Sequence, residues 1–568
     1  MELPELLKVA RGEAPADLLI KNARVVNVFT GEIIETNVAI AGGRIAGLGD
    51  YAAKAEEDLQ ETYLCPGFID AHVHIESSMV PPDEYARAVV PTGTTTVVCD
   101  PHEIANVLGL AGIRFMIDNA RDLPLDVRVM APSCVPATDM ETSGARLLAK
   151  DLETLLSDPK VLGLAEVMNF PGVVHGAPEV LDKLHAFRDR VKDGHAPRLT
   201  GKQLCAYVAA EILSDHECTT VVEAREKLRL GMWIFIREGT FARNLHELVK
   251  VVDDNTDRRV CLCSDDRSPA DLMDEGHLDH MVRVAIGQGM EPVRAIALAT
   301  FNPSEYFGLK DRGAIVPGRR ADLVAFSRLD APKADTVWSE GRVVARSGYP
   351  SHWPRRPREG EVPRKMNVAW DKVGLRVEGD GRRVRVIGVV PDQLLTRHMV
   401  EDLSSKDGAV QAAPERDILK MAVIERHEGT GRTGLGFLHG FGLRRGAIAS
   451  TVAHDHHNLV IAGADDASMM TAAKAVAATG GGKAVALGDK VLALTPLPIA
   501  GLMSDQPFEA VRKQMDACHE AARGLGSTLR DPFIALSFMA LPVIPSLKLT
   551  DHGLVDVDKF QIVPLTAT

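Results

Sequence analysis

The sequence lacks the features of a membrane or secreted protein. It contains no uninterrupted apolar run of about 18 residues, so no membrane-spanning helix is expected. Residues 1–19 have no long apolar core after a basic region, which argues against a signal peptide. The eight cysteines are scattered and form no CxxC pair, so free thiols in a reducing compartment are expected. The sequence therefore indicates a cytoplasmic protein without a membrane partner.

Positive charge is also scarce, since 65 Lys and Arg stand against 78 Asp and Glu, giving a formal net charge of −13. A general nucleic-acid-binding protein needs basic patches to contact phosphates, so no nucleic-acid partner is expected. A nucleobase remains possible as a small-molecule substrate. No Walker sequence occurs, and Gly440, Gly442 and Gly446 do not meet the GxGxxG spacing of a dinucleotide loop, so no cofactor beyond metal is indicated.

The length of 568 residues predicts about two to four domains. Short strands with glycine turns are predicted before residue 64, and a similar pattern returns after residue 313. We expect 1–64 and 314–365 to form one composite β-sandwich domain, ending in a linker rich in Pro and basic residues at 349–365. Residues 366–568 mix strand and helix patterns and predict a separate C-terminal α/β domain.

Between the two β-rich segments, residues 65–313 alternate strand-like and helix-like stretches. A length of about 250 residues is usual for a (β/α)8 barrel. The predicted fold class is therefore α/β, with a (β/α)8 TIM-like barrel at its centre. The eight predicted strands are Gly67–His74, Thr94–Asp100, Val127–Pro132, Val161–Val167, Val191–His195, Leu213–His216, Met232–Arg237 and Val260–Asp265.

Two histidines close the first predicted strand, in the stretch PGFIDAHVHIESS at 66–78. Residues i and i+2 of a strand point to the same side, so His72 and His74 can bind one metal ion together. A bare HxH is more often two ordinary strand histidines, so this pair alone does not establish a metal site.

Four further metal-binding side chains end later predicted strands: Glu166, His195, His216 and Asp265. Catalytic groups of such barrels lie where strands end and loops begin. Four imidazoles and two carboxylates, without thiolate, suit Zn²⁺, Fe²⁺ or Mn²⁺. The six residues together predict a pair of divalent metal ions that activates water, with Glu166 as the bridge between them.

The ordered set of HVHIES, the strand-four acid, two later histidines and the last-strand Asp resembles the binuclear members of the amidohydrolase superfamily. Many of those proteins use a carboxylated lysine where this sequence has Glu166. That departure and the long C-terminal region are similar to bacterial adenine deaminases. The segments TTTVVCDPHEIANVLG, AEVMNFPGV, LGFLHGFGL, AHDHHN and PLPIAGLMS also match, so the resemblance covers nearly the whole chain.

The resemblance implies metal-dependent hydrolytic deamination of adenine to hypoxanthine and ammonia, as in purine salvage. Binding to a divalent ion lowers the pKa of water from about 15.7 toward roughly 7, so a hydroxide could attack C6. Asp265 is assigned the proton-shuttling role, and Glu166 is assigned to assembly of the metal pair. Mn²⁺ or Fe²⁺ is expected, with Zn²⁺ as an alternative, and a homo-oligomer, namely a dimer, is expected on general grounds.

Substrate contacts are predicted after strands two and seven. Asp100, His102 and Glu103 follow strand two, where they could contact substrate, support the metal ligands or hold a further ion. The alternative is that Asp100 and Glu103 cap a helix. Arg237 and Glu238 end strand seven, where the arginine could bind a purine nitrogen or form a structural salt bridge.

The C-terminal motif AHDHHN holds His454, Asp455, His456 and His457. One hypothesis is a metal site in this loop. The other, suggested by the resemblance, is that the loop approaches the barrel mouth and helps to close the pocket, with His456 as a substrate contact.

Three expectations concern neighbouring residues. Asp266 and Ser264 flank Asp265 and should point away from its metal face, because side chains alternate along a strand. Cys261 and Cys263 should be core residues. His277 and His280 are expected at the surface.

Two other functions remain open. A cyclic amidohydrolase of the dihydropyrimidinase type would use the same hydroxide against a carbonyl carbon. Glu166 and the C-terminal domain favour the deaminase instead. A non-catalytic binding module would need no metal ligands, so the intact set argues against it. The choice between free base and nucleoside is not settled, although no ribose or phosphate site is evident.

Overall fold

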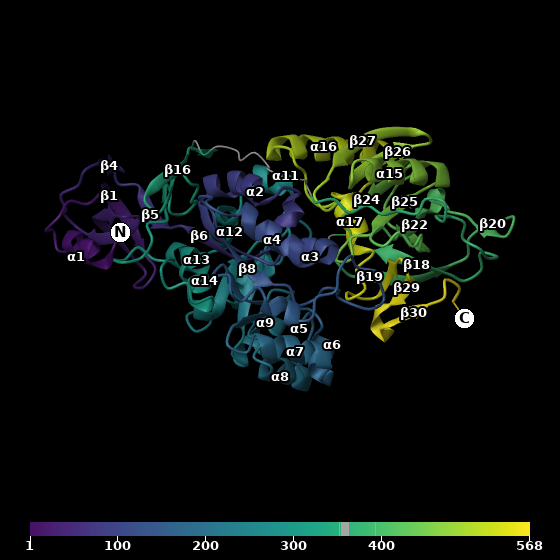
Figure 1. Cartoon of the computed structure of the whole chain (residues 1–568), viewed down its shortest axis with the longest axis horizontal. Helices are drawn as coiled ribbons and strands as arrows, with labels where there is room; N and C mark the ends of the chain where they lie inside the picture. Colours follow the sequence, from purple (N-terminus) through teal and green to yellow (C-terminus); the bar gives the residue numbers. More distant parts are fainter. Residues whose placement is uncertain (352, 354–362, 392, 568) are drawn as a thin grey trace.

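The computed structural model describes residues 1–351, 353, 363–391 and 393–567. A β-rich unit lies at the N-terminal end and a unit of strands and helices lies in the middle (Figure 1). The region from residue 363 onward, which we call the C-terminal half, lies at the other end (Figure 1). The expected linker at 349–365 falls largely outside the described residues, at 352 and 354–362. None of the helices within the described ranges is long and apolar enough to cross a membrane.

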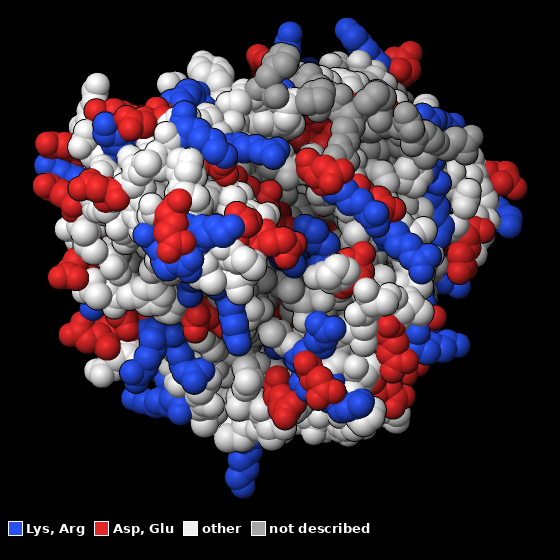
Figure 2. Space-filling model, turned by 60° about the vertical axis from the view of Figure 1, so that its left-hand side comes forward, with Lys and Arg blue, Asp and Glu red and all other residues white. Residues whose placement is uncertain are grey.

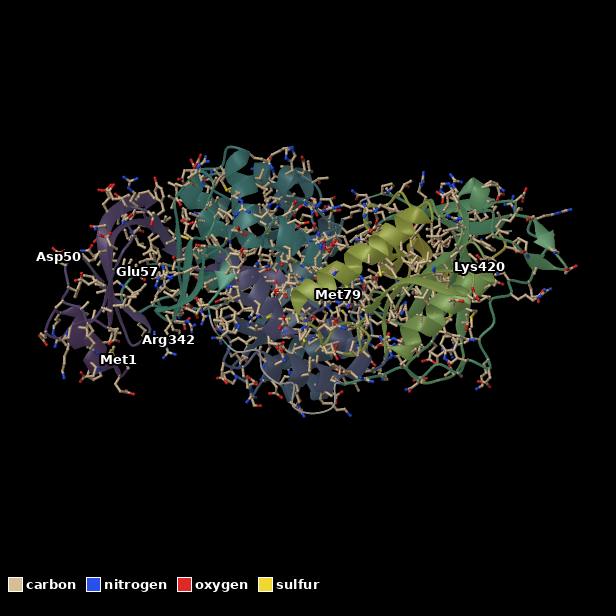
Figure 3. The ribbon with its side chains drawn as sticks, turned by 90° about the horizontal axis from the view of Figure 1, so that it is seen from above. Met1, Asp50, Glu57, Met79, Arg342 and Lys420 are labelled. Atoms are coloured by element: carbon tan, nitrogen blue, oxygen red, sulfur yellow. The ribbon has the colours of Figure 1, made fainter. Side chains whose placement is uncertain are left out.

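The two segments that flank the barrel region share one sheet, which has nine strands in the described part of the chain. They join where β5 pairs antiparallel with β14, with Leu64 opposite Ala325. Figure 3 shows Glu57 of the first segment and Arg342 of the second at the same end of the molecule. The strands are β1 (Leu18–Asn27), β2 (Glu32–Ala41), β3 (Arg44–Leu48), β4 (Glu56–Asp58), β5 (Tyr63–Pro66), β14 (Leu323–Phe326), β15 (Thr336–Ser339), β16 (Arg342–Arg346) and β17 (Tyr349–Pro350).

The order β17-β16-β15-β14-β5-β1-β2-β3, with β4 beside β1, runs through one continuous hydrogen-bonded sheet. The sequence predicts a β-sandwich for these two segments. Their alternation of apolar and polar residues indicates strands but does not show which strands pair. The buried side chains of this sheet gather around Trp338, which is fully buried.

Eight parallel strands occupy the middle of the described chain, and each overlaps a predicted strand. They are β6 (Phe68–Val73), β7 (Thr94–Cys99), β8 (Asp126–Ala131), β9 (Val161–Val167), β10 (Val191–Gly194), β11 (Ser214–Asp215), β12 (Trp233–Arg237) and β13 (Val260–Cys263). They pair in the orders β10-β9-β8-β7-β6 and β11-β12-β13.

The last strand returns to the first. The Asp265 N–H donates to the His72 carbonyl at 3.0 Å, and the His74 N–H donates to the Asp265 carbonyl at 3.2 Å. Between β10 and β11, the Leu213 N–H reaches the Lys192 carbonyl at 3.5 Å. This curled parallel sheet is consistent with the predicted TIM-like barrel. Cys261 and Cys263 pack in its apolar interior with Met130 and Phe235, which confirms their assignment as core residues.

Helices surround these strands, as the alternating sequence pattern predicts (Figure 1). Asn169, Thr220 and Ser268 cap three of them by accepting a hydrogen bond from the first turn. Besides α1 (Leu3–Ala10), the helices are α2 (Pro82–Val89), α3 (His102–Leu108), α4 (Leu110–Asn119), α5 (Ala149–Glu153), α6 (Phe170–His175), α7 (Pro178–Ala186), α8 (Gly201–Ala209), α9 (Val221–Arg229), α10 (Leu245–Leu248), α11 (Pro269–Asp274), α12 (Leu278–Gly287), α13 (Pro292–Leu298) and α14 (Phe301–Tyr306).

The C-terminal half is built on an eight-stranded sheet within its described residues, in the order β19-β18-β23-β22-β25-β24-β26-β27. These strands are β18 (Val384–Val389), β19 (Thr396–Glu401), β22 (Ile418–Ile424), β23 (Thr433–His439), β24 (Ala447–Ser450), β25 (Leu459–Gly463), β26 (Gly482–Leu487) and β27 (Lys490–Pro496). Helices α15 (Asp466–Ala478), α16 (Phe508–Gly524) and α17 (Pro532–Phe538) accompany them, with short strands β20 (Ser405–Lys406), β21 (Ala409–Val410), β28 (Leu547–Thr550), β29 (Gly553–Asp556) and β30 (Gln561–Val563).

The strand patterns RVRVIGVV, KMAVIER, LVIAG, KAVALG and KVLALTPL predict β18, β22, β25, β26 and β27, and the helix patterns DDASMMTAAKAVAATG and PFEAVRKQMDACHEAARGLG predict α15 and α16. The remaining strands of this sheet, β19, β23 and β24, were not predicted. Of these, β23 and β24 are rich in Gly and Ala, which have low strand propensity.

The C-terminal half packs directly on the loops that follow the barrel strands. The Phe508 N–H at the start of α16 donates to Glu84 Oε2 at 3.0 Å, and the Ser504 N–H donates to the Met79 carbonyl at 2.8 Å. Met79 lies where the two halves meet (Figure 3). The Asn458 side chain donates to the Thr142 carbonyl at 2.8 Å. One hydrophobic core runs through both halves.

The visible surface carries both signs of charge. On the face drawn in Figure 2, Lys and Arg side chains intermingle with Asp and Glu.

Candidate active site

The six predicted metal ligands lie together, and all are buried. They come from the carboxyl ends of five strands, β6, β9, β10, β11 and β13, or from the first residues beyond those ends. We call this set the strand-end cluster: His72, His74, Glu166, His195, His216 and Asp265.

Glu166 lies at the centre of the strand-end cluster. Its Oε1 is 3.2 Å from His74 Nε2, and its Oε2 is 3.3 Å from His216 Nε2 and 3.9 Å from His195 Nε2. Burial alone would raise the pKa of Glu166, but the hydrogen bond and charge of His216 lower it well below its usual value. Each carboxylate oxygen therefore faces a different set of imidazoles, as a bridging ligand requires.

The spacing of these side chains fits bound cations. His72 Nε2 lies 3.1 Å from His74 Nε2, and His74 Nε2 lies 3.2 Å from Asp265 Oδ1. Metal–ligand bonds of about 2.0–2.2 Å place tetrahedral ligands roughly 3.3–3.6 Å apart. Buried imidazole and carboxylate donors at this spacing suit divalent transition metals or zinc. The residues present therefore fit a pair of divalent ions.

Arg237 orders the last ligand. Its guanidinium donates to Asp265 Oδ2 at 2.9 Å and also pairs with both carboxylate oxygens of Glu217. Asp265 thus keeps Oδ1 toward His72 and His74 while Oδ2 is held on the other side. Arg237 therefore forms a salt bridge, one of the two roles predicted for it, and its partners are Glu217 and Asp265, not Glu238.

Asp266 differs from its expected orientation. Strand β13 ends at Cys263, and Asp265 adopts a left-handed backbone with φ of 55°, so strand alternation no longer applies. Asp266 therefore lines the cavity and accepts a hydrogen bond from Ser77. Ser264 does point away, toward Asp70, with which it forms two hydrogen bonds.

A cavity that is partly open to solvent lies over the strand-end cluster, and the space between its walls is about 510 Å³ when the open side is included. Of the predicted substrate contacts, His102, Glu103 and Arg237 line it.

The other three predicted contacts are absent from the described lining and make contacts elsewhere. Asp100 accepts from His102 Nδ1 at 3.0 Å and does not cap α3. Glu238 accepts from the Leu245 N–H at 3.2 Å. His456 is fully buried, and its Nδ1 accepts from the Asn458 N–H at 2.9 Å. Strand-end position alone could not distinguish side chains facing the cavity from those facing their own loop.

The C-terminal half supplies a large part of the cavity wall. His454 and Asp455 of the AHDHHN motif line it, which agrees with the hypothesis that this loop approaches the barrel mouth. His457 also reaches the barrel, where its Nε2 pairs with Glu103 Oε2.

Several lining residues were not predicted. Glu217 follows directly on His216 and could have been found as the neighbour of a strand-end ligand. The apolar wall has no local signal, because its members come from segments far apart in the chain. These residues are Met168, Phe241, Leu394, Phe538, Leu541 and Ile544.

His277 was wrongly expected at the surface. It is 1% exposed, and its ring lies 3.0 Å from the Tyr85 hydroxyl and 2.7 Å from the Thr94 hydroxyl. Its Nε2 is also 3.0 Å from Asp70 Oδ2. His280, on the same helix, is only partly buried.

A buried ion pair lies beside His216, the histidine that directly follows β11. The Lys227 ammonium donates to Asp215 Oδ2 at 2.9 Å and to Glu223 Oε1 at 2.8 Å, and Lys227 and Asp215 are fully buried. Burial would raise the pKa of Asp215, but the Lys227 charge lowers it to about 2. Lys227 therefore keeps the segment beside His216 charged and ordered.

We expect Lys227→Met to lower the free energy of unfolding by about 3–5 kcal/mol, because it leaves a buried carboxylate without its cation. Urea unfolding followed by circular dichroism measures the loss. The exposed Lys202→Met is the matched control and should unfold as the wild type does. Equal midpoints for both variants would contradict the assignment.

Comparison with known proteins agrees with this geometry. Residues 63–344 match the amidohydrolase family and residues 393–561 match the adenine deaminase C-terminal domain. The adenine deaminase of Desulfatibacillum aliphaticivorans is 51% identical over 563 residues, covering 99% of each chain. Adenine deaminase 2 of Carboxydothermus hydrogenoformans is 46% identical over 566 residues, again covering 99% of each. A crystal structure titled as that of an adenine deaminase aligns with a TM-score of 0.46 and 18% identity, covering 58% of this chain and 99% of its own. With full-length relatives at this level of identity, the chain belongs to the adenine deaminase family of amidohydrolases.

Proposed function

We propose that this protein catalyses the hydrolytic deamination of adenine, in which adenine and water give hypoxanthine and ammonia. The observation that carries the proposal is the strand-end cluster, which lies buried beneath a cavity that is partly open to solvent. A pair of divalent ions held there would supply activated water at neutral pH. The full-length relatives named adenine deaminase support adenine as the substrate.

Asp265 is the proposed proton carrier. The reaction needs a proton at the purine N1 and another at the departing amine, and a carboxylate beside the activated water can supply both in turn. Asp265 lines the cavity while Arg237 fixes its Oδ2 at 2.9 Å. Glu166 is proposed to assemble the metal pair, because its two oxygens face different imidazoles.

Arg237 is proposed to bind the purine directly, and His102 and Glu103 are proposed to form the cavity wall on the β7 side. Asp100 is proposed to act through His102, whose Nδ1 it binds at 3.0 Å, and Glu238 is proposed to order the loop after β12. His456 does not line the cavity, and in its place His454 and Asp455 are proposed to form the wall that the C-terminal loop supplies.

The apolar wall is proposed to stack on the purine ring. Phe538 is central to it, since its ring stacks on His454 with a centroid distance of 4.6 Å and lies 5.6 Å from the ring of Phe241.

We expect Phe538→Ala to raise KM for adenine about 5- to 150-fold, because stacking of a base on an aromatic ring contributes about 1–3 kcal/mol. The change in kcat should be smaller. Steady-state kinetics measure both constants, and the exposed Phe560→Ala is the control. An unchanged KM in Phe538→Ala would argue against stacking at this wall.

Turnover of free adenine tests the function. Purified protein is loaded separately with Mn²⁺, Fe²⁺ or Zn²⁺, and hypoxanthine and ammonia are quantified, with adenosine and dihydrouracil as parallel substrates. We expect hypoxanthine from adenine. Opening of dihydrouracil without adenine turnover would instead assign the chain to the cyclic amidohydrolases.

We also propose the identity of the metal, the oligomeric state, the cellular location and the division into structural units. Mn²⁺ or Fe²⁺ is the proposed metal, with Zn²⁺ as the alternative, because the donors are imidazoles and carboxylates. A homodimer is proposed from the general frequency of such assemblies. A cytoplasmic location is proposed because all eight cysteines, each within the described residues, are free. The proposed units are the barrel at 65–313, the composite β-domain and linker at 1–64 and 314–365, and the C-terminal domain at 366–568.

A further inference from the structure

A second cluster of metal-binding side chains lies where the barrel meets the C-terminal half. We call it the mouth cluster: His102, Glu103, His454 and Asp455. Glu103 Oε1 lies 3.4 Å from His102 Nε2 and 3.1 Å from His454 Nε2. Asp455 Oδ1 lies 3.8 Å from His102 Nε2. Ligands about 2.0–2.2 Å from one shared ion lie roughly 3.3–3.6 Å apart, and these three separations bracket that range.

One oxygen of each carboxylate in the mouth cluster accepts no aligned hydrogen bond. Glu103 is 2% exposed and Asp455 is 3% exposed. Within the described residues, Glu103 Oε1 and Asp455 Oδ2 have no hydrogen-bond partner, since the nearby imidazoles are close but poorly aligned. Buried polar atoms without partners are costly, and two buried carboxylates side by side repel each other. A bound cation among these oxygens would offset their charge, alongside the imidazoles of His102 and His454.

Both histidines are oriented as metal ligands usually are. A histidine that binds a metal commonly donates its other ring N–H to a carboxylate or another polar oxygen. His102 Nδ1 lies 3.0 Å from Asp100 Oδ2, and His454 Nδ1 lies 2.5 Å from Ser537 Oγ. With these nitrogens bonded, both Nε2 atoms are left facing Glu103.

The neighbouring His457 does not compete for the same position. Its Nδ1 accepts from the Ala453 N–H at 3.1 Å, so its proton lies on Nε2, where it donates to Glu103 Oε2. Glu103 thus has one oxygen bonded to a neutral histidine and the other, Oε1, turned toward the cluster.

The mouth cluster is separate from the strand-end cluster. His102 lies between them: its Nδ1 faces Asp100 and is 3.5 Å from Glu166 Oε1, whereas its Nε2 faces Glu103 and Asp455. The Nδ1 atom of His102 therefore faces the strand-end cluster, and its Nε2 atom faces the mouth cluster.

We propose that His102, Glu103, His454 and Asp455 bind a further divalent cation, of the Mn²⁺ or Zn²⁺ class, at the mouth of the cavity. Two nitrogen and two oxygen donors suit such ions. Because two ligands come from the barrel and two from the C-terminal loop, the ion ties that loop to the barrel. The inference goes beyond the deaminase function and does not depend on it.

Anomalous scattering at the manganese edge, from crystals of the full-length protein loaded with Mn²⁺, tests the site. The expected result is a peak between His102 Nε2 and Asp455 Oδ1, distinct from any peak at the strand-end cluster. Peaks only at the strand-end cluster would overturn the proposal, whatever the enzyme's activity. Because wild-type protein is used, the result does not depend on how a variant folds.

Metal content per chain gives a second readout. After gel filtration, the wild type should retain about three Mn²⁺ ions and Asp455→Asn or His454→Asn about two. The matched control is His398→Asn, which changes a partly exposed histidine of β19 far from the cluster and should keep the wild-type content. Equal content in all four proteins would overturn the proposal. In His216→Asn, a peak that remains at the mouth cluster while the strand-end peaks weaken would show that the two sites are independent.

Discussion

Replacement of Asp265 by Asn should lower kcat/KM for adenine by about 10²–10⁴-fold. The amide keeps the size of the side chain and an oxygen for Arg237, but it cannot accept and return a proton at neutral pH. The charge next to His72 and His74 is also lost. Steady-state kinetics of the metal-loaded variant give the change, with hypoxanthine as the measured product.

Metal analysis of the same sample separates two causes of a low rate. A variant that retains its ions and still loses turnover identifies Asp265 as the proton carrier. The exposed Asp189→Asn is the control and should match the wild type. A metal-replete Asp265→Asn protein with wild-type turnover would remove Asp265 from the mechanism.

Replacement of Glu166 by Gln should abolish the metal pair and lower turnover by about 10³-fold or more, since metal activation contributes several kcal/mol. Glu166 lies 3.2 Å from His74 through one carboxylate oxygen and 3.3 Å from His216 through the other. A neutral amide cannot offset two cations.

Metal content is the direct measurement for Glu166→Gln, because activity alone does not report assembly. We expect the ions of the strand-end cluster to be lost during gel filtration, whereas the exposed Glu153→Gln retains them. If Glu166→Gln keeps full metal content and loses only rate, the residue would act in the chemistry and not in assembly.

Four ligands of the strand-end cluster, His72, His74, Glu166 and Asp265, were predictable because they end apolar runs, whereas His195 and His216 end the shorter and more polar stretches VKDGH and LSDH. In a parallel sheet these ends meet on one side, so six residues spread from His72 to Asp265 could be expected to converge. The parallel strands themselves were predicted for the same reason: each run of Val and Ile between turns can only be buried as a strand or a helix, and its length favours a strand.

The cavity wall was not predictable in the same way. Phe538 and Leu394 reach the site only through packing of the C-terminal half on the barrel, and no local pattern encodes that contact. Asp266 depends on the left-handed backbone of Asp265, which strand alternation does not describe. The pairing of β5 with β14 connects residues about 260 positions apart, and composition could show only that both segments form strands.

The backbone hydrogen bonds of Asp265 to His72 and His74 close the barrel between β13 and β6, which we call the seam. The same three residues are ligands of the strand-end cluster, so closure of the barrel and assembly of the active site depend on the same contacts. The backbone of Asp265, the proposed proton carrier, links the end of β13 to β6. It does so by hydrogen bonds to the backbones of His72 and His74, which are themselves proposed metal ligands. A fluctuation that parts this seam displaces three ligands at once. Loss of the metal pair and opening of the ring should therefore be a single event, and amide exchange at His74 and Asp265 should slow when metal is bound.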